Sequence, residues 1–223
     1  VRSRGLGDVY KRQVHDDQIV TINLPLSTGY AQTVSNLGRM ENKGHEATLT
    51  LRPLRGVVED LNFELFGTFS QNDNEVITIT DDLDELTVGG PFGNTGISIV
   101  AREGLPFGTF KGLAPKTNEE GQVIVDPNTG LPLYTDEEVY LGSYQPDYLL
   151  SFGTNASYKG FGLRVLVDMK EGGNFVSQTK YNTEFNGTAI NTTIYDREPF
   201  IIPNSVVENE DGTFSENLSL IHI

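Results

Sequence analysis

Apolar and polar residues alternate along residues 61–70 of this chain. One side carries Leu61, Phe63, Leu65, Gly67 and Phe69, and the other carries Asn62, Glu64, Phe66, Thr68 and Ser70. Successive side chains of a β-strand point to opposite faces, so a period of two predicts a strand with one apolar face. A helix repeats every 3.6 residues and cannot sort this pattern onto one face.

Three further stretches alternate in the same way, and we expect each to form a strand. They are 45–52, 148–157 and 161–170, with one face formed by Ala47, Leu49 and Leu51, by Tyr148, Leu150, Phe152, Thr154 and Ala156, and by Phe161, Leu163, Val165, Val167 and Met169. Shorter candidate strands are 18–24, 75–80, 96–102 and 174–181. A strand that crosses a bilayer at a tilt needs roughly 9–11 residues, whereas strands of soluble sheets usually have about five or six. The longer stretches therefore favour a membrane-spanning sheet.

The second face of these strands is polar, with Glu64, Arg164, Asp168 and Lys170 in mid-strand. A soluble barrel fills its interior with packed apolar side chains, whereas a transmembrane barrel has an apolar outside and a polar inside. Tyr148, Tyr158 and Phe161 lie at strand ends, where membrane barrels place aromatic girdles. A soluble antiparallel sandwich also alternates, so the pattern alone leaves both folds open.

Composition excludes several other classes of protein. The 223 residues correspond to one large domain or two small ones, and no apolar run approaches the length of a membrane-spanning helix. Cysteine is absent, so a disulfide scaffold, a thiolate zinc site and a cysteine nucleophile are excluded. A net charge of −15 argues against a nucleic-acid partner.

The two ends differ from the rest of the chain. Residues 1–13 hold four basic residues against a single Asp8, and residues 218–223 read LSLIHI without any turn-forming residue. Both segments resemble translated sequencing-adaptor read-through, so we expect 1–13 and 218–223 to be non-native and 14–217 to be the protein proper. The alternative is a native basic tail and a native apolar tail.

The connections between the expected strands are unequal. Residues 158–161 form a tight turn, whereas 81–94 and 114–144 are long, acidic and rich in Gly and Pro. Short turns on one side and long loops on the other are typical of outer-membrane barrels.

Residues 36–46 read NLGRMENKGHE, which resembles the N-x-G-x-x-E-N-K-G-x-E segment of SusC/RagA-like TonB-linked outer-membrane transporters. Other segments resemble this family in the same order: 24–30 (LPLSTGY), 69–76 (FSQNDNEV), 102–108 (REGLPFG), 141–146 (LGSYQP), 157–161 (SYKGF) and 196–205 (DREPFIIPNS). Each segment is weakly specific alone, but together they cover about 18–206. We expect Gly38 and Gly44 to flank a sharp entry into a strand with positive φ, which only glycine adopts easily.

The resemblance implies an incomplete antiparallel transmembrane β-barrel of roughly eight to ten strands, well below the 22 of plugged transporters. It also implies TonB-dependent import of large nutrients, commonly oligosaccharides and sometimes peptides, across the cell outer membrane. A SusD-like surface lipoprotein, the TonB complex and outer-membrane lipid would be partners. In this family the plug domain and the segment that contacts TonB belong to N-terminal parts, which we do not find here. No catalytic role and no cofactor are implied. The alternatives are a secreted β-sandwich that binds carbohydrate and, third, a glycoside hydrolase.

Few residues suggest a chemical site. Asp126, Asn128 and Glu137 match positions 1, 3 and 12 of a calcium loop, but Gly130 stands at position 5 instead of 6, so a plain acidic turn is the alternative. Tyr134, Tyr140 and Tyr144 lie in or beside a long loop and are candidate substrate contacts, with an interfacial aromatic girdle and loop packing as the alternative. The acidic pairs, such as Glu119-Glu120 and Glu137-Glu138, read as solvated charge. His15, His45 and His222 have no ligand-like spacing.

Overall fold

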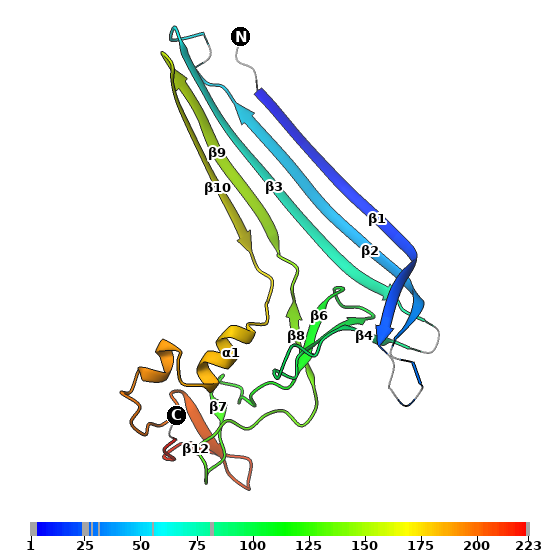
Figure 1. Cartoon of the computed structure of the whole chain (residues 1–223), viewed down its shortest axis with the longest axis vertical. Coiled ribbons are helices and arrows are strands. Elements are labelled where there is room, and N and C mark those ends of the chain that lie inside the picture. The colour runs from blue at the N-terminus through cyan, green and yellow to red at the C-terminus, as the bar shows by residue number, and fades with distance from the viewer. Residues whose placement is uncertain are drawn as a thin grey trace. The chain divides into compact units, whose positions relative to one another are not determined.

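The computed structural model describes residues 4–23, 27, 29–30, 32–54, 56–80 and 83–221. Parts of four expected features lie outside these residues: Leu24 of the first short strand, most of 24–30, Asp81 and Asp82 of the first long loop, and the outermost residues of both ends with His222. The described strands and helices, shown in Figure 1, are β1(Arg4–Asn23), β2(Gln32–Leu51), β3(Leu61–Thr78), β4(Glu85–Gly89), β5(Ser98–Arg102), β6(Thr109–Gly112), β7(Val123–Ile124), β8(Val139–Ser143), β9(Tyr148–Tyr158), β10(Phe161–Glu171), α1(Gln178–Phe185), the 3₁₀ helix η2(Ile190–Thr193), β11(Ser205–Glu208) and β12(Phe214–Glu216).

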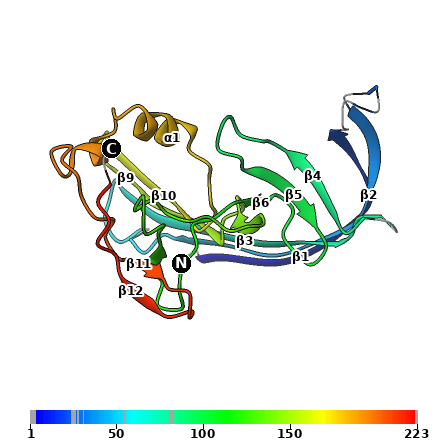
Figure 2. The same ribbon diagram turned by 90° about the horizontal axis from the view of Figure 1, so that it is seen from below.

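The chain divides into two compact units. The first comprises 1–88, 100–109 and 142–174, and the second comprises 89–99, 110–141 and 175–223. A five-stranded antiparallel sheet of order β1-β2-β3-β9-β10 dominates the first unit. Figure 2 shows this sheet curved rather than flat. A four-stranded sheet has the order β4-β5-β6-β8.

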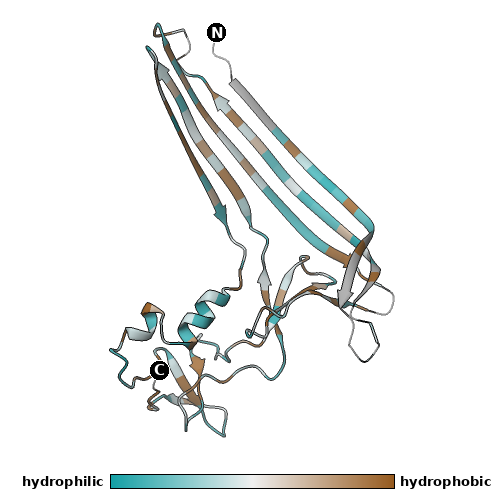
Figure 3. Cartoon of the chain, in the orientation of Figure 1, coloured by the Kyte–Doolittle hydropathy of each residue, from teal (hydrophilic) through white to brown (hydrophobic). Residues whose placement is uncertain are grey.

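The register of the five-stranded sheet gathers the predicted apolar positions onto one face. Leu65 lies opposite Leu51 on one side and opposite Thr154 on the other, and Thr154 lies opposite Val165. Because directly opposed residues share a face, the alternating sets of β2, β3, β9 and β10 form one continuous apolar surface. Figure 3 shows the alternation along these strands. The face is open to solvent, with Leu163 61% and Phe161 83% exposed.

This apolar surface has the height of a bilayer core. The ten steps from Tyr148 to Tyr158, at about 3.3 Å each, span about 33 Å along β9, which a tilt of about 40° reduces to about 25 Å. That is the height of the lipid-facing band of an outer-membrane barrel. Aromatic side chains lie at both limits of this band: Tyr158 and Phe161 at one end, and Tyr148 with Phe69 (ring centroids 5.8 Å apart) at the other.

The expected strands at 148–157 and 161–170 match β9 and β10, which have 11 residues each. The expected strands at 18–24, 45–52 and 61–70 were too short, because β1, β2 and β3 have 20, 20 and 18 residues. In β3 the apolar face ends at Phe69, and the same face continues with Gln71, Asp73 and Glu75. The expected short strand at 75–80 is the end of β3. The three strands therefore extend past the apolar band, and residues 70–75 of β3 are polar on both faces. A register shift between β2 and β3 lies within this extension, between Arg39 and Met40.

The turn between β9 and β10 confirms the expected tight connection. Tyr158 and Phe161 are directly paired, and the two residues between them, Lys159 and Gly160, have φ of 46° and 86°. Two positive φ values are required by a type I′ turn, whose twist matches that of the flanking strands. The long connections, 79–147 and the segment after Glu171, leave the opposite end of the sheet.

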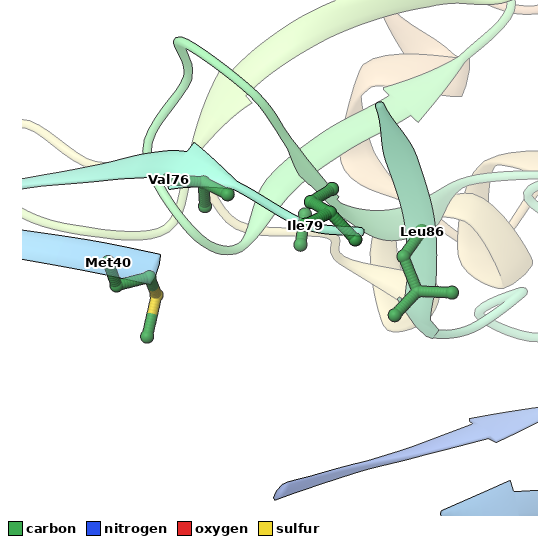
Figure 4. Close-up of a cluster of buried hydrophobic side chains, with 5 residues drawn as sticks. Met40, Val76, Ile79 and Leu86 are labelled. Carbon is green, nitrogen blue, oxygen red and sulfur yellow. The ribbon is translucent and has the colours of Figure 1, made fainter. Parts of the chain in front are cut away.

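A small hydrophobic core lies beside the extension of β2 and β3. Its buried members are Met40, Val76, Ile79, Leu86 and Ala101, with Val88 and Phe107 packed against them. Figure 4 shows Val76 and Ile79 with Met40 and Leu86, from β2 and β4, around them. The segment after β5 runs along β3, because Gly104 N–H donates to the Val76 carbonyl (2.8 Å) and Val76 N–H donates to the Leu105 carbonyl (3.0 Å).

The structure corrects the expectation for Gly38 and Gly44. Both lie inside β2, and neither has a positive φ. A Cβ on Gly38 would meet the Ile79 carbonyl oxygen at 2.6 Å, and a Cβ on Gly44 would meet the Gln71 carbonyl oxygen at 2.6 Å. Glycine is needed at both positions because the neighbouring backbone leaves no room for a side chain.

The second unit contains a small sheet of order β12-β11-β7, in which β11 pairs antiparallel with β12 and parallel with β7 over two residues. The expected strand at 174–181 is wrong: residues 174–177 are irregular and α1 begins at Gln178. Ser177 caps this helix by accepting a hydrogen bond from Lys180 N–H (3.1 Å), and the Tyr181 and Phe185 rings stack one turn apart. Among the described residues, no helix is both long and apolar enough to span a membrane.

Candidate functional site

The polar face of the five-stranded sheet carries a row of charged and amide side chains that begins just after β2 and ends in β10. Arg52 and Glu64 form an ion pair of 2.5 Å, and Asn155 Nδ2 donates to the other oxygen of Glu64 at 3.1 Å. Arg164 of β10 lies directly opposite Asn155. Arg52, Glu64 and Asn155 border a polar cavity of about 440 Å³ that is also lined by Asn62 and Ser157. The mid-strand charges predicted from sequence therefore lie together on the face opposite the apolar band.

Further along this face most residues are polar or small, and Phe66, Leu149 and Leu166 are large apolar exceptions. Ser151 donates to Asp168 at 2.5 Å between β9 and β10. Phe66 covers Gly153 of β9, where a Cβ would meet the phenyl ring at 2.7 Å and would also clash with the Val165 carbonyl oxygen. The one large apolar residue of β3 on this face is thus accommodated by a glycine on the adjacent strand.

Beyond the apolar band, four chain segments meet around asparagine side chains. Asn74 Nδ2 donates to Asn42 Oδ1 (2.7 Å), and Asn74 Oδ1 accepts from Phe107 N–H (2.8 Å). Gln145 Nε2 donates to the Phe107 carbonyl (3.0 Å). We call Asn42, Asn74, Phe107 and Gln145 the rim cluster. The rim cluster joins residues from the segments 36–46, 69–76, 102–108 and 141–146, which are separate motifs in the sequence.

Glu41, in the same extension of β2 and outside the apolar band, is paired with two cations. Lys43 Nζ lies 2.9 Å from one oxygen of Glu41, and Arg12 contacts the other. The hydrogen bond from Lys43, followed by that from Arg12, holds the pKa of Glu41 below its usual 4.5. The same contact raises the pKa of Lys43.

A second cavity of about 440 Å³ lies next to the rim cluster, entirely within the first unit. We call it the loop pocket, and define it by Asn72, Pro106, Ser143, Gln145, Asp147 and Gly172, which line it. It is open to solvent and is formed where β3, the segment before β9 and the segment after β10 come together.

The predicted tyrosines are all exposed but do not lie in the loop pocket. Tyr134 and Tyr140 belong to the second unit, where Lys111 Nζ lies 5.8 Å from the centre of the Tyr140 ring. Tyr144 belongs to the first unit, and its ring occupies the position that a Cβ on Gly108 would take. Their role in substrate contact stays a prediction.

The Asp126 side chain closes a turn, as in the plain acidic turn considered above as the alternative to a calcium loop. One carboxylate oxygen accepts hydrogen bonds from the N–H groups of Asn128 and Thr129, both at 2.8 Å. These bonds, led by that from Thr129, lower the pKa of Asp126. Glu137 is exposed. In the described part of the chain, no three His, Cys, Asp or Glu side chains are grouped to hold a metal ion.

Comparison with known proteins identifies relatives among outer-membrane receptors. No family model matches the chain. TonB-dependent receptor P3 of Formosa agariphila is 23% identical over 198 residues, which cover 80% of this chain and 19% of that receptor. The TonB-dependent receptor SusC of Bacteroides thetaiotaomicron is 26% identical over 164 residues, 69% of this chain and 16% of SusC. This chain resembles a SusC/RagA-like TonB-dependent receptor.

Solved structures agree at the level of the fold. The RagAB peptide transporter superposes with a TM-score of 0.59 at 19% identity, over 74% of this chain and 19% of that one. The same complex in its "open-open" state gives a TM-score of 0.55. The chain spans about a fifth of the length of the TonB-dependent receptors it matches. Its fold is accordingly that of an open antiparallel wall of a TonB-dependent receptor barrel.

Sequence reasoning missed two features of this receptor-like wall: the rim cluster and the loop pocket. Asn72 and Asn74 continue the polar face of β3 in the same period of two as Glu64, Phe66 and Thr68. That period is a usable signal for the face on which they lie. The partners of these residues come from segments far away in sequence, which no local pattern indicates.

Proposed function

We propose that this chain forms part of the barrel wall of an outer-membrane, TonB-dependent importer of large nutrients, chiefly oligosaccharides. The observation that carries the proposal is the register that gives the sheet one apolar face, about 25 Å high, and one polar face. A wall of this kind separates lipid from an aqueous or plugged interior.

The resemblance to SusC supports the proposed partners. A SusD-like surface lipoprotein would close the loop-bearing end, and the TonB complex would drive import through parts of the receptor beyond this chain. The matched RagAB structures are of a peptide transporter, so peptides are the second class of cargo. The wall contributes no covalent chemistry to this process; it lines the path and anchors the loops.

The orientation of the sheet toward lipid is tested with tryptophan placed on adjacent residues. The 223 residues contain no tryptophan, so each variant carries one reporter. Val165→Trp lies on the apolar face of β10 and Leu166→Trp on the polar face, at nearly the same depth. In vesicles containing lipids brominated on their acyl chains, we expect strong quenching of the fluorescence of the Val165→Trp variant and weak quenching of that of the Leu166→Trp variant.

Equal quenching at both positions, or a protein that stays soluble without detergent, contradicts the proposal and favours a secreted module. Import itself is tested by uptake of fluorescent oligosaccharides into cells that make the whole receptor, with and without TonB. Uptake that does not depend on TonB contradicts the transport mechanism while leaving the position of the wall intact.

A further inference from the structure

Glycines let the segments that form the loop pocket approach each other closely. A Cβ on Gly172 would clash with the Asp147 carboxyl group, and a Cβ on Gly173 would meet the Tyr144 carbonyl oxygen at 2.8 Å. Asn174 N–H donates to the Ser143 carbonyl at 2.7 Å and Asp147 N–H to the Glu171 carbonyl at 2.8 Å. The segments before β9 and after β10 are thereby fixed against each other.

The polar groups at the pocket are held in place by the same scaffold. Gln145 is anchored at its Nε2 by the Phe107 carbonyl, and no described residue donates to its Oε1. Ser143 Oγ accepts from Gln145 N–H at 3.2 Å and keeps its own O–H for donation. Asp147 adds a carboxylate, which accepts only. The lining therefore offers both acceptors and donors.

We propose that the loop pocket binds an uncharged sugar unit of an oligosaccharide; this inference rests on the proposed import function. Each sugar hydroxyl both donates and accepts a hydrogen bond, which suits a lining of carboxylate, amide and hydroxyl groups. Pro106 and Pro146 supply apolar surface for the C–H faces of a sugar ring. A cavity of about 440 Å³ lies within the roughly 300–1,000 Å³ of small-molecule sites.

The charge of the pocket selects between classes of sugar. Its described lining contains Asp73 and Asp147 but no Lys or Arg. A uronate carboxylate bound beside Asp147 would be repelled without a compensating cation. The pocket therefore favours neutral sugars over acidic ones. The same described lining contains no aromatic or large aliphatic residue that would hold a peptide side chain.

The test uses the protein in detergent micelles and a panel of neutral oligosaccharides (malto-, xylo- and manno-oligosaccharides), oligogalacturonates and short peptides. We expect the protein to bind a neutral oligosaccharide, and Asp147→Asn to weaken that binding about tenfold or more, because hydrogen bonds to a charged group are the stronger ones. The same variant should bring oligogalacturonate binding closer to that of the neutral sugar. Asp136→Asn, an equivalent change at an exposed residue of the second unit, should alter neither.

Three results would overturn the inference: no neutral oligosaccharide in the panel binds, the Asp147 variant binds it as well as the unchanged protein, or oligogalacturonates or peptides are preferred. Ser143→Ala provides a second variant, for which we expect weaker neutral-sugar binding with an unchanged preference over uronates. The tryptophan measurement on β10 does not depend on the pocket. If the binding test fails but the fluorescence of Val165→Trp is quenched by lipid, the proposal of a barrel wall stands. If both tests fail, the proposed function is contradicted.

Discussion

Asn74 holds Phe107 to the sheet through a hydrogen bond of 2.8 Å from the Phe107 backbone N–H to the asparagine side-chain oxygen. The other end of the Asn74 amide donates to Asn42 at 2.7 Å. One side chain thus ties β3 both to β2 and to the segment that follows β5. Neither contact is visible as a local pattern, because 33 and 32 residues separate the partners.

Replacing Asn74 by Ala should release residues 103–108 from β3. Loss of the side chain leaves the half-buried Phe107 N–H and the Asn42 oxygen without these partners, at an expected cost of about 1–3 kcal/mol. Hydrogen exchange at the Phe107 amide measures the effect directly. Asn74→Asp is the matched control, since it keeps the acceptor for Phe107 and loses only the donor to Asn42. Equal exchange in both variants would assign the protection of Phe107 to another contact.

The two β2 glycines should not tolerate a methyl group. Gly38→Ala and Gly44→Ala each place a Cβ within 2.6 Å of a backbone carbonyl oxygen, and moving that backbone should cost about 1–3 kcal/mol. Gly162→Ala in β10 is the control, because nothing lies within 4 Å of its Cβ position. Thermal unfolding in detergent, followed by gel mobility, should show lower midpoints for the first two variants only. A Gly162→Ala midpoint as low as theirs would contradict the packing argument.

An arginine on the apolar face should destabilise the membrane-embedded sheet far more than one on the polar face. Val165 lies near the middle of the apolar positions of β10, where an arginine facing lipid costs about 2–4 kcal/mol. Leu166→Arg faces the other side, beside Gly153, and should cost clearly less. Urea unfolding from lipid vesicles gives both values. The reverse order would mean that the faces are assigned the wrong way round.

Acid should weaken the extension of β2 through Glu41. Because its pKa in the folded protein lies below the usual 4.5, the ionised carboxylate stabilises the fold above that pH, and this contribution is lost as the pH falls through the lowered pKa. Glu41→Gln should be less stable than the unchanged protein at neutral pH and should lose less stability on acidification. Denaturant midpoints at a series of pH values on both sides of 4.5 measure this. Glu46→Gln, which removes an exposed partner of Lys11 from the same strand, is the matched control. Parallel profiles for the Glu41 variant and the unchanged protein would show that this pair does not carry the acid sensitivity.

The membrane-facing part of the fold was predictable because one physical rule governs it. Where one face meets lipid and the other meets polar groups, the sequence must alternate, as it does from Leu61 to Phe69 and from Phe161 to Met169. From Ser70 to Glu75 both faces are polar, so the alternation stops although the strand continues to Thr78. Without alternation, no local pattern indicates how far the strand continues.

The candidate site was less predictable, since its geometry depends on contacts between distant segments. The role of Gly44 follows from the Gln71 carbonyl on the next strand, and the position of Gln145 follows from Phe107. The segment 174–181 was mistaken for a strand because the cap at Ser177 outweighs the strand preference of its neighbours Phe175 and Val176. Substrate contact by Tyr134, Tyr140 and Tyr144 stays a prediction, and so does calcium binding at Asp126.

The continuation of β3 beyond Phe69 sets the height above the membrane at which the loops are attached. Residues 71–78 rise about 23 Å along the strand, or about 18 Å along the membrane normal at a tilt of about 40°. The polar headgroup layer of each leaflet is roughly 5–8 Å thick. The loops are therefore attached above the headgroup layer, at the ends of hydrogen-bonded strands. An arriving ligand contacts this ordered part of the protein before it contacts the headgroups.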